Sequence, residues 1–316
     1  MPAVNDYPVE ITPPDITPYC DGNTGIDYMT TLESGRPGPH VMITAVTHGN
    51  ELCGAVVLDF LFRNVTRPKR GKLTLGFTNY KAYQNFDPAF PGLSRYVDED
   101  FNRLWSEDVL DGTRDTWELA RAREVRPLVD QADFLLDIHS MQTKTPALVL
   151  AGPLAKGREL AAAVGCPEYV VSDEGHAAGK RMRDYGEFGD PASPKNALLV
   201  ECGQHWESAS VDIAMQTALR FLKHMDVLND AFIDPLVAGN PPPQKFIEVT
   251  EAVTIKNDSF RFVDDFVGME VIPKAGTPLG HDGDDPVTTP YDNCVLIMPT
   301  RRTTRGHTAV RLGRFL

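Results

Sequence analysis

A histidine and a glutamate three residues apart, His48 and Glu51, form the first pair in the chain that is able to bind a metal ion. They follow an apolar, β-branched run at 41–46, which predicts a buried strand, and Gly49 and Asn50 between them favour a sharp turn. A helical pattern begins directly afterwards, so the pair is expected at the carboxyl end of a strand, where open α/β sheets bind ligands. The alternative is an ordinary helix start, in which Asn50 caps the helix and Glu51 interacts with its dipole.

A catalytic zinc site needs a third protein ligand, and His139 is the best candidate. It ends the apolar run 133–139, and the carboxyl ends of parallel strands meet at one edge of a sheet. The alternative is a buried, hydrogen-bonded histidine. His40 precedes its strand and is expected at the opposite edge. The other histidines have less suitable positions in loops, polar stretches or a helix: His176, His205, His224, His281 and His307.

Glu201 ends a third apolar run, 197–201. Burying a carboxylate there is costly unless the group has a partner. Beside a metal-activated water it would accept a proton and then deliver that proton to the leaving group. The alternatives are an ion pair with a basic side chain, or a position among the metal ligands. Cys202 is better explained as a small core residue than as a nucleophile.

The long irregular stretch 80–105 contains two arginines and an asparagine near its end, Arg95, Asn102 and Arg103. Long loops without structure of their own are usually functional or disordered, and the aromatic residues and arginine favour a functional loop. Arginine binds carboxylates through paired hydrogen bonds and stabilises a developing oxyanion. The alternative, favoured by the loop alone, is that these are surface arginines paired with the acidic residues 98–100.

The elements that would position these residues alternate between strands and helices, which predicts a mainly parallel or mixed sheet with helices on both faces. The further predicted strands are 71–79, 147–150 and 169–171, and the predicted helices follow residue 51 and span 115–129, 154–164 and 210–228. The glycine-rich, polar stretch 174–194 predicts a surface excursion.

The chain divides into three predicted parts. Residues 1–235 form the catalytic domain, within which 1–39 is an N-terminal arm with one short strand at 28–32. The proline-rich stretch 236–245 reads as a linker. Residues 246–316 form a small all-β, barrel-like domain, which is expected to pack against the catalytic domain or to roof its site.

The bulk properties limit the possible partners. A net charge of −13 over 316 residues argues against binding nucleic acid or anionic membranes. No apolar run reaches the roughly 20 residues of a membrane helix, and the N-terminus lacks the pattern of a signal peptide. The five cysteines are scattered and form no CxxC pair, which predicts free thiols and a cytoplasmic protein.

Four motifs in order resemble the signature of the succinylglutamate desuccinylase/aspartoacylase family, and the resemblance spans roughly residues 40–228. The motifs are His48-Gly-Asn-Glu51, the run from Arg95 to Arg103, Asp137-Ile-His139, and Val200-Glu-Cys-Gly203. The resemblance implies a carboxypeptidase-like α/β domain that uses one zinc ion to hydrolyse the amide bond of a small anionic N-acyl amino acid.

The resemblance also implies a role for each residue of these motifs. The implied zinc ligands are His48, Glu51 and His139. Glu201 corresponds to the general base and acid, and Arg95 to the arginine that polarises the scissile carbonyl. Asn102 and Arg103 correspond to the pair that binds the substrate carboxylate.

The chain departs from the aspartoacylase pattern around its substrate pocket. The further arginine that precedes the catalytic glutamate has no clear equivalent here, and the candidates to replace it are Arg181, Arg183 and Lys195. After the glutamate, His205 and Trp206 are expected to shape the pocket. The rival functions are a zinc carboxypeptidase acting on peptides, a non-catalytic metal-binding homologue and an ester hydrolase, and a homo-oligomer is compatible with each.

Overall fold

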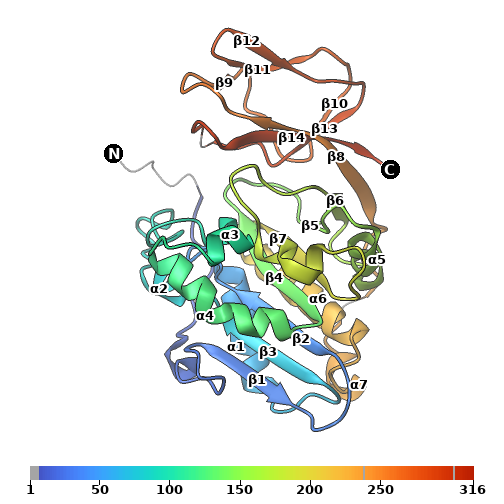
Figure 1. Cartoon of the computed structure of the whole chain (residues 1–316). Coiled ribbons are helices and arrows are strands. Elements are labelled where there is room, and N and C mark those ends of the chain that lie inside the picture. The colour runs from blue at the N-terminus through green and yellow to red at the C-terminus, as the bar shows by residue number, and fades with distance from the viewer. Residues whose placement is uncertain (1–6, 238, 302) are drawn as a thin grey trace.

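The computed structural model describes residues 7–237, 239–301 and 303–316, and its largest element is a mixed sheet of eleven strands (Figure 1). The strands of this sheet are β1 (Met29–Glu33), β2 (His40–Ala45), β3 (Lys72–Phe77), β4 (Phe134–Met141), β5 (Leu148–Leu150), β6 (Tyr169–Ser172), β7 (Asn196–Gln204), β8 (Lys245–Thr254), β10 (Val271–Ile272), β13 (Cys294–Ile297) and β14 (Thr308–Phe315). Their order is β1-β3-β2-β4-β7-β5-β6-β8-β14-β13-β10. A second sheet contains β9 (Arg261–Phe262), β11 (Pro278–Asp282) and β12 (Asp285–Thr288).

The centre of the large sheet is parallel, because β3, β2, β4 and β7 pair side by side in the same direction. All six residues of β2 and seven of the eight residues of β4 are buried. Such continuous apolar strands are typical of a parallel sheet that is covered on both faces. The carboxyl ends of these strands therefore lie at one edge, as the sequence predicts.

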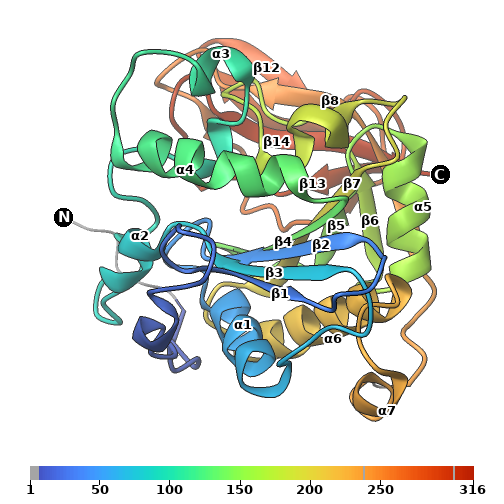
Figure 2. The same ribbon diagram turned by 60° about the horizontal axis from the view of Figure 1, so that its bottom comes forward.

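Helices cover both faces of this sheet (Figure 2). One face packs against α1 (Leu52–Asn64), α5 (Ala155–Val164) and α6 (Ser208–His224), and the other against α4 (Trp117–Gln131). The remaining short helices are η1 (Thr17–Tyr19), α2 (Tyr80–Gln84), η2 (Phe101–Arg103), α3 (Glu107–Leu110), η3 (Met182–Asp184), η4 (Gly186–Gly189) and α7 (Asp230–Ile233). The predicted fold class, a mixed α/β sheet with helices on both faces and an all-β C-terminal part, is confirmed.

The C-terminal strands form the upper part of the molecule in Figure 1, and β8 runs between the two parts. This strand pairs parallel with β6 and antiparallel with β14, so residues 245–254 belong to the sheet of both parts. The division at residues 235 and 245 into a catalytic domain, a linker and a β-domain stays a prediction.

The stretch 174–194 is a surface excursion only in part, because its ends are largely exposed whereas its middle is buried. Met182, Tyr185 and Phe188 are buried in the core between α4 and the sheet, and Arg181 and Arg183 are buried as well. The polar composition hid this burial because Asp173 binds Arg181 and the backbone carbonyl of Ala151 accepts a hydrogen bond from Arg183.

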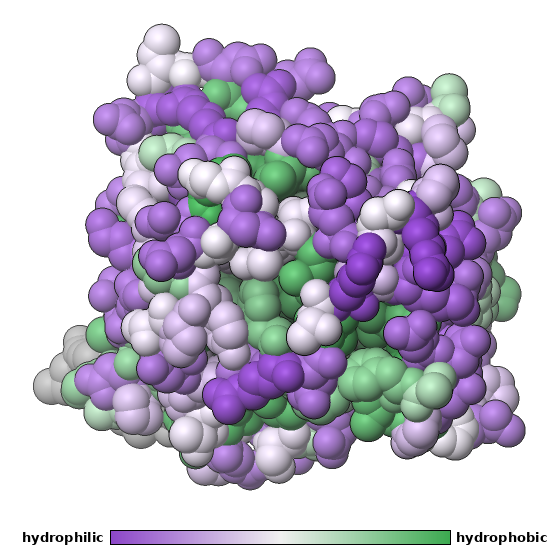
Figure 3. All heavy atoms as spheres, turned by 90° about the horizontal axis from the view of Figure 1, so that it is seen from below, coloured by the Kyte–Doolittle hydropathy of each residue, from purple (hydrophilic) through white to green (hydrophobic). Residues whose placement is uncertain are grey.

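The face opposite the C-terminal strands is mainly hydrophilic around its rim, with hydrophobic residues showing nearer its middle (Figure 3). Within the described residues, no helix is both long enough and apolar enough to cross a membrane. Single exposed apolar residues are ordinary on a protein surface.

Candidate active site

The carboxyl ends of β2 and β4 bring His48, Glu51 and His139 together in a buried cluster. One ligand atom from each residue lies within 4.8 Å of the others. The side chains of all three residues are almost completely inaccessible to solvent. The three residues predicted as metal ligands from their positions at strand ends are therefore neighbours in space.

Each histidine of the cluster is held between two carboxylates. The Nδ1 atom of His48 lies 2.7 Å from Glu51 Oε1, and the Nδ1 atom of His139 lies 2.8 Å from Glu51 Oε2. The other ring nitrogens face Asp100 Oδ1 at 2.9 Å and Asp137 Oδ2 at 2.7 Å. Metal-binding histidines usually give their second nitrogen to a carboxylate in this way, which fixes the ring and its tautomer. The donor set therefore fits a zinc ion bound by two Nδ1 atoms and one carboxylate.

The tight turn between the first two ligands depends on a glycine. A Cβ atom on Gly49 would lie 2.2 Å from the backbone of Ala82 and 2.5 Å from the carbonyl oxygen of Ser94. The Gly49 N–H donates to the carbonyl oxygen of Arg95 at 3.0 Å, which joins the turn to the arginine loop. Although Glu51 stands at the start of α1, its carboxylate makes no capping hydrogen bond and instead faces the two histidines. The geometry thus favours the metal interpretation over a helix cap.

The charges within the cluster favour an ionised Glu51 and a protonated His139 as long as no metal is bound. Burial by itself would raise the pKa of Glu51, but the charges of His48 and His139 outweigh it and hold this pKa well below its usual range. Burial opposes a charge on His139, yet Asp137 and Glu51 raise the pKa of His139 well above its ordinary value. Metal binding requires neutral imidazole, so a metal ion would displace this proton.

Glu201 lies beside the cluster because β4 and β7 pair in register, with His139 opposite Glu201. The residue is only 7% exposed, and its Oε2 atom has no hydrogen-bond partner. Within the described chain, Glu201 forms no ion pair and is not one of the clustered metal-ligand candidates, which favours neither alternative from the sequence. Burial, together with the charge of Glu51, raises the pKa of Glu201 to about 8.

The raised pKa of Glu201 makes the stability of the metal-free protein depend on pH. Between its ordinary pKa of 4.5 and about 8, the folded state keeps a proton that the unfolded chain has released. The free energy of unfolding therefore falls as the pH rises through this window. Glu201→Gln has no such proton, so it should lose less stability than the wild type between pH 5 and pH 8. Denaturant unfolding of both proteins, after a chelator has removed any metal, measures this. If the free energy of unfolding fell equally with pH in the wild type and the variant, the assigned pKa shift would be contradicted.

Arg95 reaches the cluster from the predicted functional loop. Its Nη2 atom lies 2.8 Å from His48 Nε2 and 2.9 Å from Asp100 Oδ2, and its Nη1 atom lies 3.4 Å from Glu51 Oε1. The arginine thus pairs with an acidic residue of its own loop, as the alternative interpretation expected. The pair nevertheless faces the metal cluster instead of lying on the surface.

All eight residues proposed from the sequence, including Asn102, Arg103 and His205, line a single cavity of about 420 Å³. The Asn102 amide lies 3.4 Å from His139 Nε2, and its Oδ1 atom accepts a hydrogen bond from the Met182 N–H. His205 is buried, with its Nδ1 atom 2.9 Å from the Ser140 hydroxyl. The lining does not include Trp206, whose indole N–H donates to the carbonyl oxygen of Asn50.

The loop that carries the arginines is held by one buried carboxylate on α4, Glu118. Its Oε1 atom accepts from the Val97 N–H at 2.6 Å and the Asn79 amide at 3.1 Å. Its Oε2 atom accepts from the N–H groups of Asp98 at 2.9 Å and Glu99 at 3.2 Å. Three successive backbone groups next to Arg95 are therefore fixed by a single side chain that is fully buried.

Glu118→Gln should lower both stability and activity, because its amide group would face N–H donors in place of one carboxylate oxygen. A buried unsatisfied group costs about 1–3 kcal/mol, and we expect a loss of that size in the free energy of unfolding. We also expect kcat/KM to fall about tenfold, since misplaced binding groups lose rate. Glu124→Gln is the matched control, because its side chain is 59% exposed on the same helix. Equal effects of the two substitutions would contradict this assignment.

Sequence reasoning missed several residues of the site. Asp137 carried a usable signal, because it precedes His139 by two residues and so shares its side of the strand. Asp100 was considered only as a surface partner for the arginines. His176 and Arg311 also line the cavity, beside Arg181, which the sequence had offered as a candidate for the missing arginine. Arg311 comes from β14, more than 100 residues after Glu201. No local pattern could have placed it there.

Fold and site together define an α/β domain with a candidate metal centre at the carboxyl edge of its sheet. Residues 37–227 match the succinylglutamate desuccinylase/aspartoacylase catalytic domain, and the chain belongs to this family. The resemblance inferred from the four motifs is thereby confirmed.

Individual relatives are similar to this chain over only part of its length. The N-acyl-aromatic-L-amino acid amidohydrolase (carboxylate-forming) of Rattus norvegicus is 31% identical over 127 residues, which cover 37% of this chain and 38% of that enzyme. The chain thus spans about two fifths of the length of the curated relatives that it matches.

Solved structures share the fold over most of the chain. The succinylglutamate desuccinylase of Vibrio parahaemolyticus superposes with a TM-score of 0.70 at 17% identity and covers 92% of this chain and 86% of its own. Murine aminoacylase 3 superposes with a TM-score of 0.60 at 20% identity and covers 90% and 97%, respectively. At these identities the likeness shows a shared fold.

Proposed function

We propose that the chain is a zinc-dependent amidohydrolase that cleaves the amide bond of an N-acyl amino acid or a related small carboxylate. The observation that supports this most strongly is the position of Glu201, which presents an unpartnered carboxylate oxygen beside a buried cluster of His48, Glu51 and His139. A carboxyl group of raised pKa next to a metal site is suited to accept and return a proton.

The chain's own residues would divide the work of hydrolysis. A zinc ion held by the cluster would act as a Lewis acid and lower the pKa of water. Glu201 would accept the proton of the attacking water and then deliver it to the leaving nitrogen. Arg95 would donate hydrogen bonds to the carbonyl oxygen as negative charge develops on it. Asn102 and Arg103 would bind the substrate carboxylate.

The shape of the cavity favours a small substrate over a peptide. The cavity that contains the candidate metal ligands is also lined by four residues of the C-terminal part, Met298, Pro299, Thr300 and Arg301. Its volume of about 420 Å³ falls in the range of pockets for small molecules. This observation favours an acyl amino acid over the carboxypeptidase alternative, and gives the C-terminal part the role of a roof.

A substrate panel with metal analysis of the same preparation tests the proposal. The zinc-loaded protein should hydrolyse N-acyl amino acids with higher kcat/KM than peptides of three or more residues or simple esters. Preference for peptides or esters would replace the proposed activity by one of the rivals. No turnover of any of them by a protein that holds one zinc ion would instead indicate a metal-binding homologue.

The proposal also includes the setting of the enzyme. All five cysteines are free, which agrees with a reducing cytoplasm. The net charge of −13 disfavours nucleic acid and anionic membranes as partners. A homo-oligomer remains compatible with the proposal.

A further inference from the structure

The cavity is lined by a group of basic residues from three separate elements, which we call the basic wall. Arg103 comes from η2, His176 and Arg181 from the segment between β6 and η3, and Arg311 from β14. In an acidic chain, such a concentration of guanidinium groups in one cavity points to an anionic ligand.

Arg181 is already neutralised by buried carboxylates. It forms a bidentate ion pair with Asp173, at 2.7 and 3.0 Å, and a second pair with Asp184. Asp184 also pairs with Arg183 at 2.6 Å. Arg181 therefore anchors the segment, and little of its charge is available to a substrate.

Among the described residues, Arg311 has no carboxylate to itself. Its Nε atom lies 3.3 Å from Asp173 Oδ2 without forming a hydrogen bond, and Asp173 is already engaged by Arg181. Three guanidinium groups, those of Arg181, Arg183 and Arg311, thus share two carboxylates. One positive charge is left over at the cavity wall, although Arg311 is only 2% exposed.

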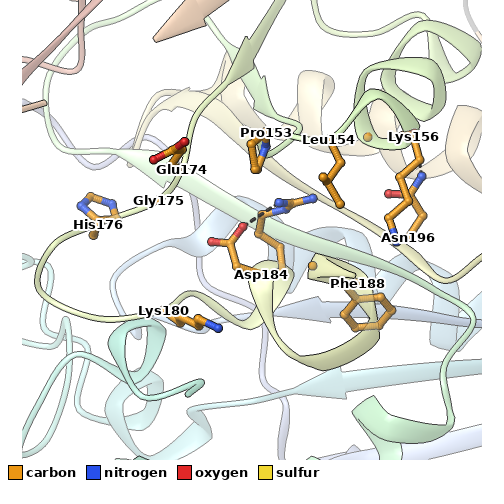
Figure 4. A pocket seen from close by; sticks show the side chains of 13 residues that line it. Pro153, Leu154, Lys156, Glu174, Gly175, His176, Lys180, Asp184, Phe188 and Asn196 are labelled. Atoms are coloured by element: carbon orange, nitrogen blue, oxygen red, sulfur yellow. Dashed lines mark hydrogen bonds and ion pairs between the residues drawn. The ribbon is translucent and has the colours of Figure 1, made fainter. Parts of the chain in front are cut away.

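The orientation of Arg311 is set by His176. Arg311 Nη2 lies 2.7 and 2.8 Å from the two ring nitrogens of this histidine. Burial and the charge of Arg311 hold the pKa of His176 well below its usual value, so its ring is a neutral neighbour and adds no counter-charge. Figure 4 shows His176 at one end of an adjoining cavity, far from Lys156 and Asn196 at the other end. His176 lines both cavities.

Arg103 completes the basic wall from the catalytic side. Its Nη1 atom donates to the carbonyl oxygen of Asn102, and within the described chain its guanidinium forms no ion pair. Burial and the charges of Arg95, Arg181 and Arg311 together lower the pKa of Arg103 to about 10, although Asp100 opposes the shift. A bound anion would relieve this mutual repulsion.

We propose that Arg311 is a substrate-binding residue, which together with Arg103 holds the substrate carboxylate between the catalytic and the C-terminal parts of the chain. This inference rests on the proposed function and names the residue that stands in for the arginine missing before Glu201. The other candidates are occupied elsewhere. Arg183 donates to the carbonyl oxygens of Ala151 and Ala197, and Lys195 pairs with Glu187.

The test compares Arg311→Met with Arg314→Met in zinc-loaded protein. Arg314 lies on the same strand but is exposed and pairs with Glu248 at 3.0 Å, so it controls for the loss of an arginine on β14. For an N-acyl amino acid, Arg311→Met should raise KM about 10- to 100-fold with a much smaller change in kcat, because it removes a charged contact made before and during the reaction. The carboxamide analogue of the same substrate should be hydrolysed equally well by the wild type and both variants.

A binding measurement separates this inference from the proposed function. Calorimetric titration with a free amino acid as the carboxylate probe should show wild-type affinity for Arg314→Met and a loss of about tenfold or more for Arg311→Met. This result would support the anion site even if the wild type hydrolysed no acyl amino acid. Affinity and KM within about twofold of the wild type in Arg311→Met would overturn the inference even if the hydrolase activity were found.

A second variant covers the case in which Arg311→Met does not fold. Arg311→Lys keeps the charge but cannot form the paired hydrogen bonds of a guanidinium, so it should weaken carboxylate binding by several-fold. Wild-type affinity in a folded Arg311→Lys protein would contradict the direct contact proposed here.

Discussion

Glu201→Gln is expected to lower kcat by about 1,000-fold while the protein still binds one zinc ion, since general acid–base groups contribute about 100- to 10,000-fold. The substitution removes the group that accepts and returns the proton but keeps the size of the side chain. Glu201 is not one of the three candidate metal ligands, so the metal site should remain intact. Steady-state kinetics and metal analysis on the same samples measure both quantities.

The shorter variant Glu201→Ala should behave in the same way and controls for effects of the amide. Circular dichroism of both variants should match the wild type, because Glu201 contributes no ion pair to the fold within the described chain. Wild-type turnover in either variant would show that another group transfers the proton. Loss of zinc from both variants would instead make Glu201 a metal ligand.

His139→Ala is expected to abolish stoichiometric zinc binding and, with it, turnover. The substitution removes one of three ligands and also leaves Asp137 without the imidazole that faces it at 2.7 Å. Ligand loss of this kind lowers metal affinity far more than loss of an outer partner, which typically costs about 10- to 100-fold. Zinc content after dialysis against a weak chelator gives the readout.

His40→Ala is the matched control for this experiment. His40 is also a largely buried histidine on the same sheet, but it contacts Thr74 and the backbone of Gln131 at the opposite end of β2. It should lose some stability and keep one zinc ion. Retention of stoichiometric zinc by His139→Ala would contradict the ligand assignment, whatever the activity of the variant.

The residues at strand ends could be predicted because sheet topology alone determines where they meet. The apolar runs before His48, His139 and Glu201 predicted parallel neighbouring strands, and parallel strands place their carboxyl ends at one edge. The pairing of His139 with Glu201 in β4 and β7 follows directly from that arrangement. The positions of these residues at strand ends were therefore enough to predict the candidate metal ligands and the proposed base.

The pocket wall could not be predicted, because it depends on contacts between segments distant in sequence. Arg311 lines the same cavity as Arg103 only because β8 continues the main sheet and pairs with β14. The burial of Arg181 and Arg183 within the stretch 174–194 could not be predicted, because they pair with Asp173 and Asp184 and composition does not reveal such pairing. Glu118 gave no signal at all, since a carboxylate on an amphipathic helix is usually exposed.

Membership of the family accounts for the fold of the chain, whereas the proposed role of Arg311 concerns the basic wall of this chain. The catalytic proposal and the substrate proposal therefore rest on separate residues. Glu201 and the cluster concern whether an amide is cleaved, and Arg103 and Arg311 concern which substrate is held.

Zinc titration of the metal-free protein tests the central claim most directly. The wild type from which a chelator has removed the metal should be inactive towards N-acyl amino acids. Its activity should rise linearly with added zinc until one ion per chain is bound. Glu201→Gln should bind the same single ion without gaining activity. Full hydrolysis by the metal-free protein, or no hydrolysis of any N-acyl amino acid with one zinc ion bound, would contradict the account.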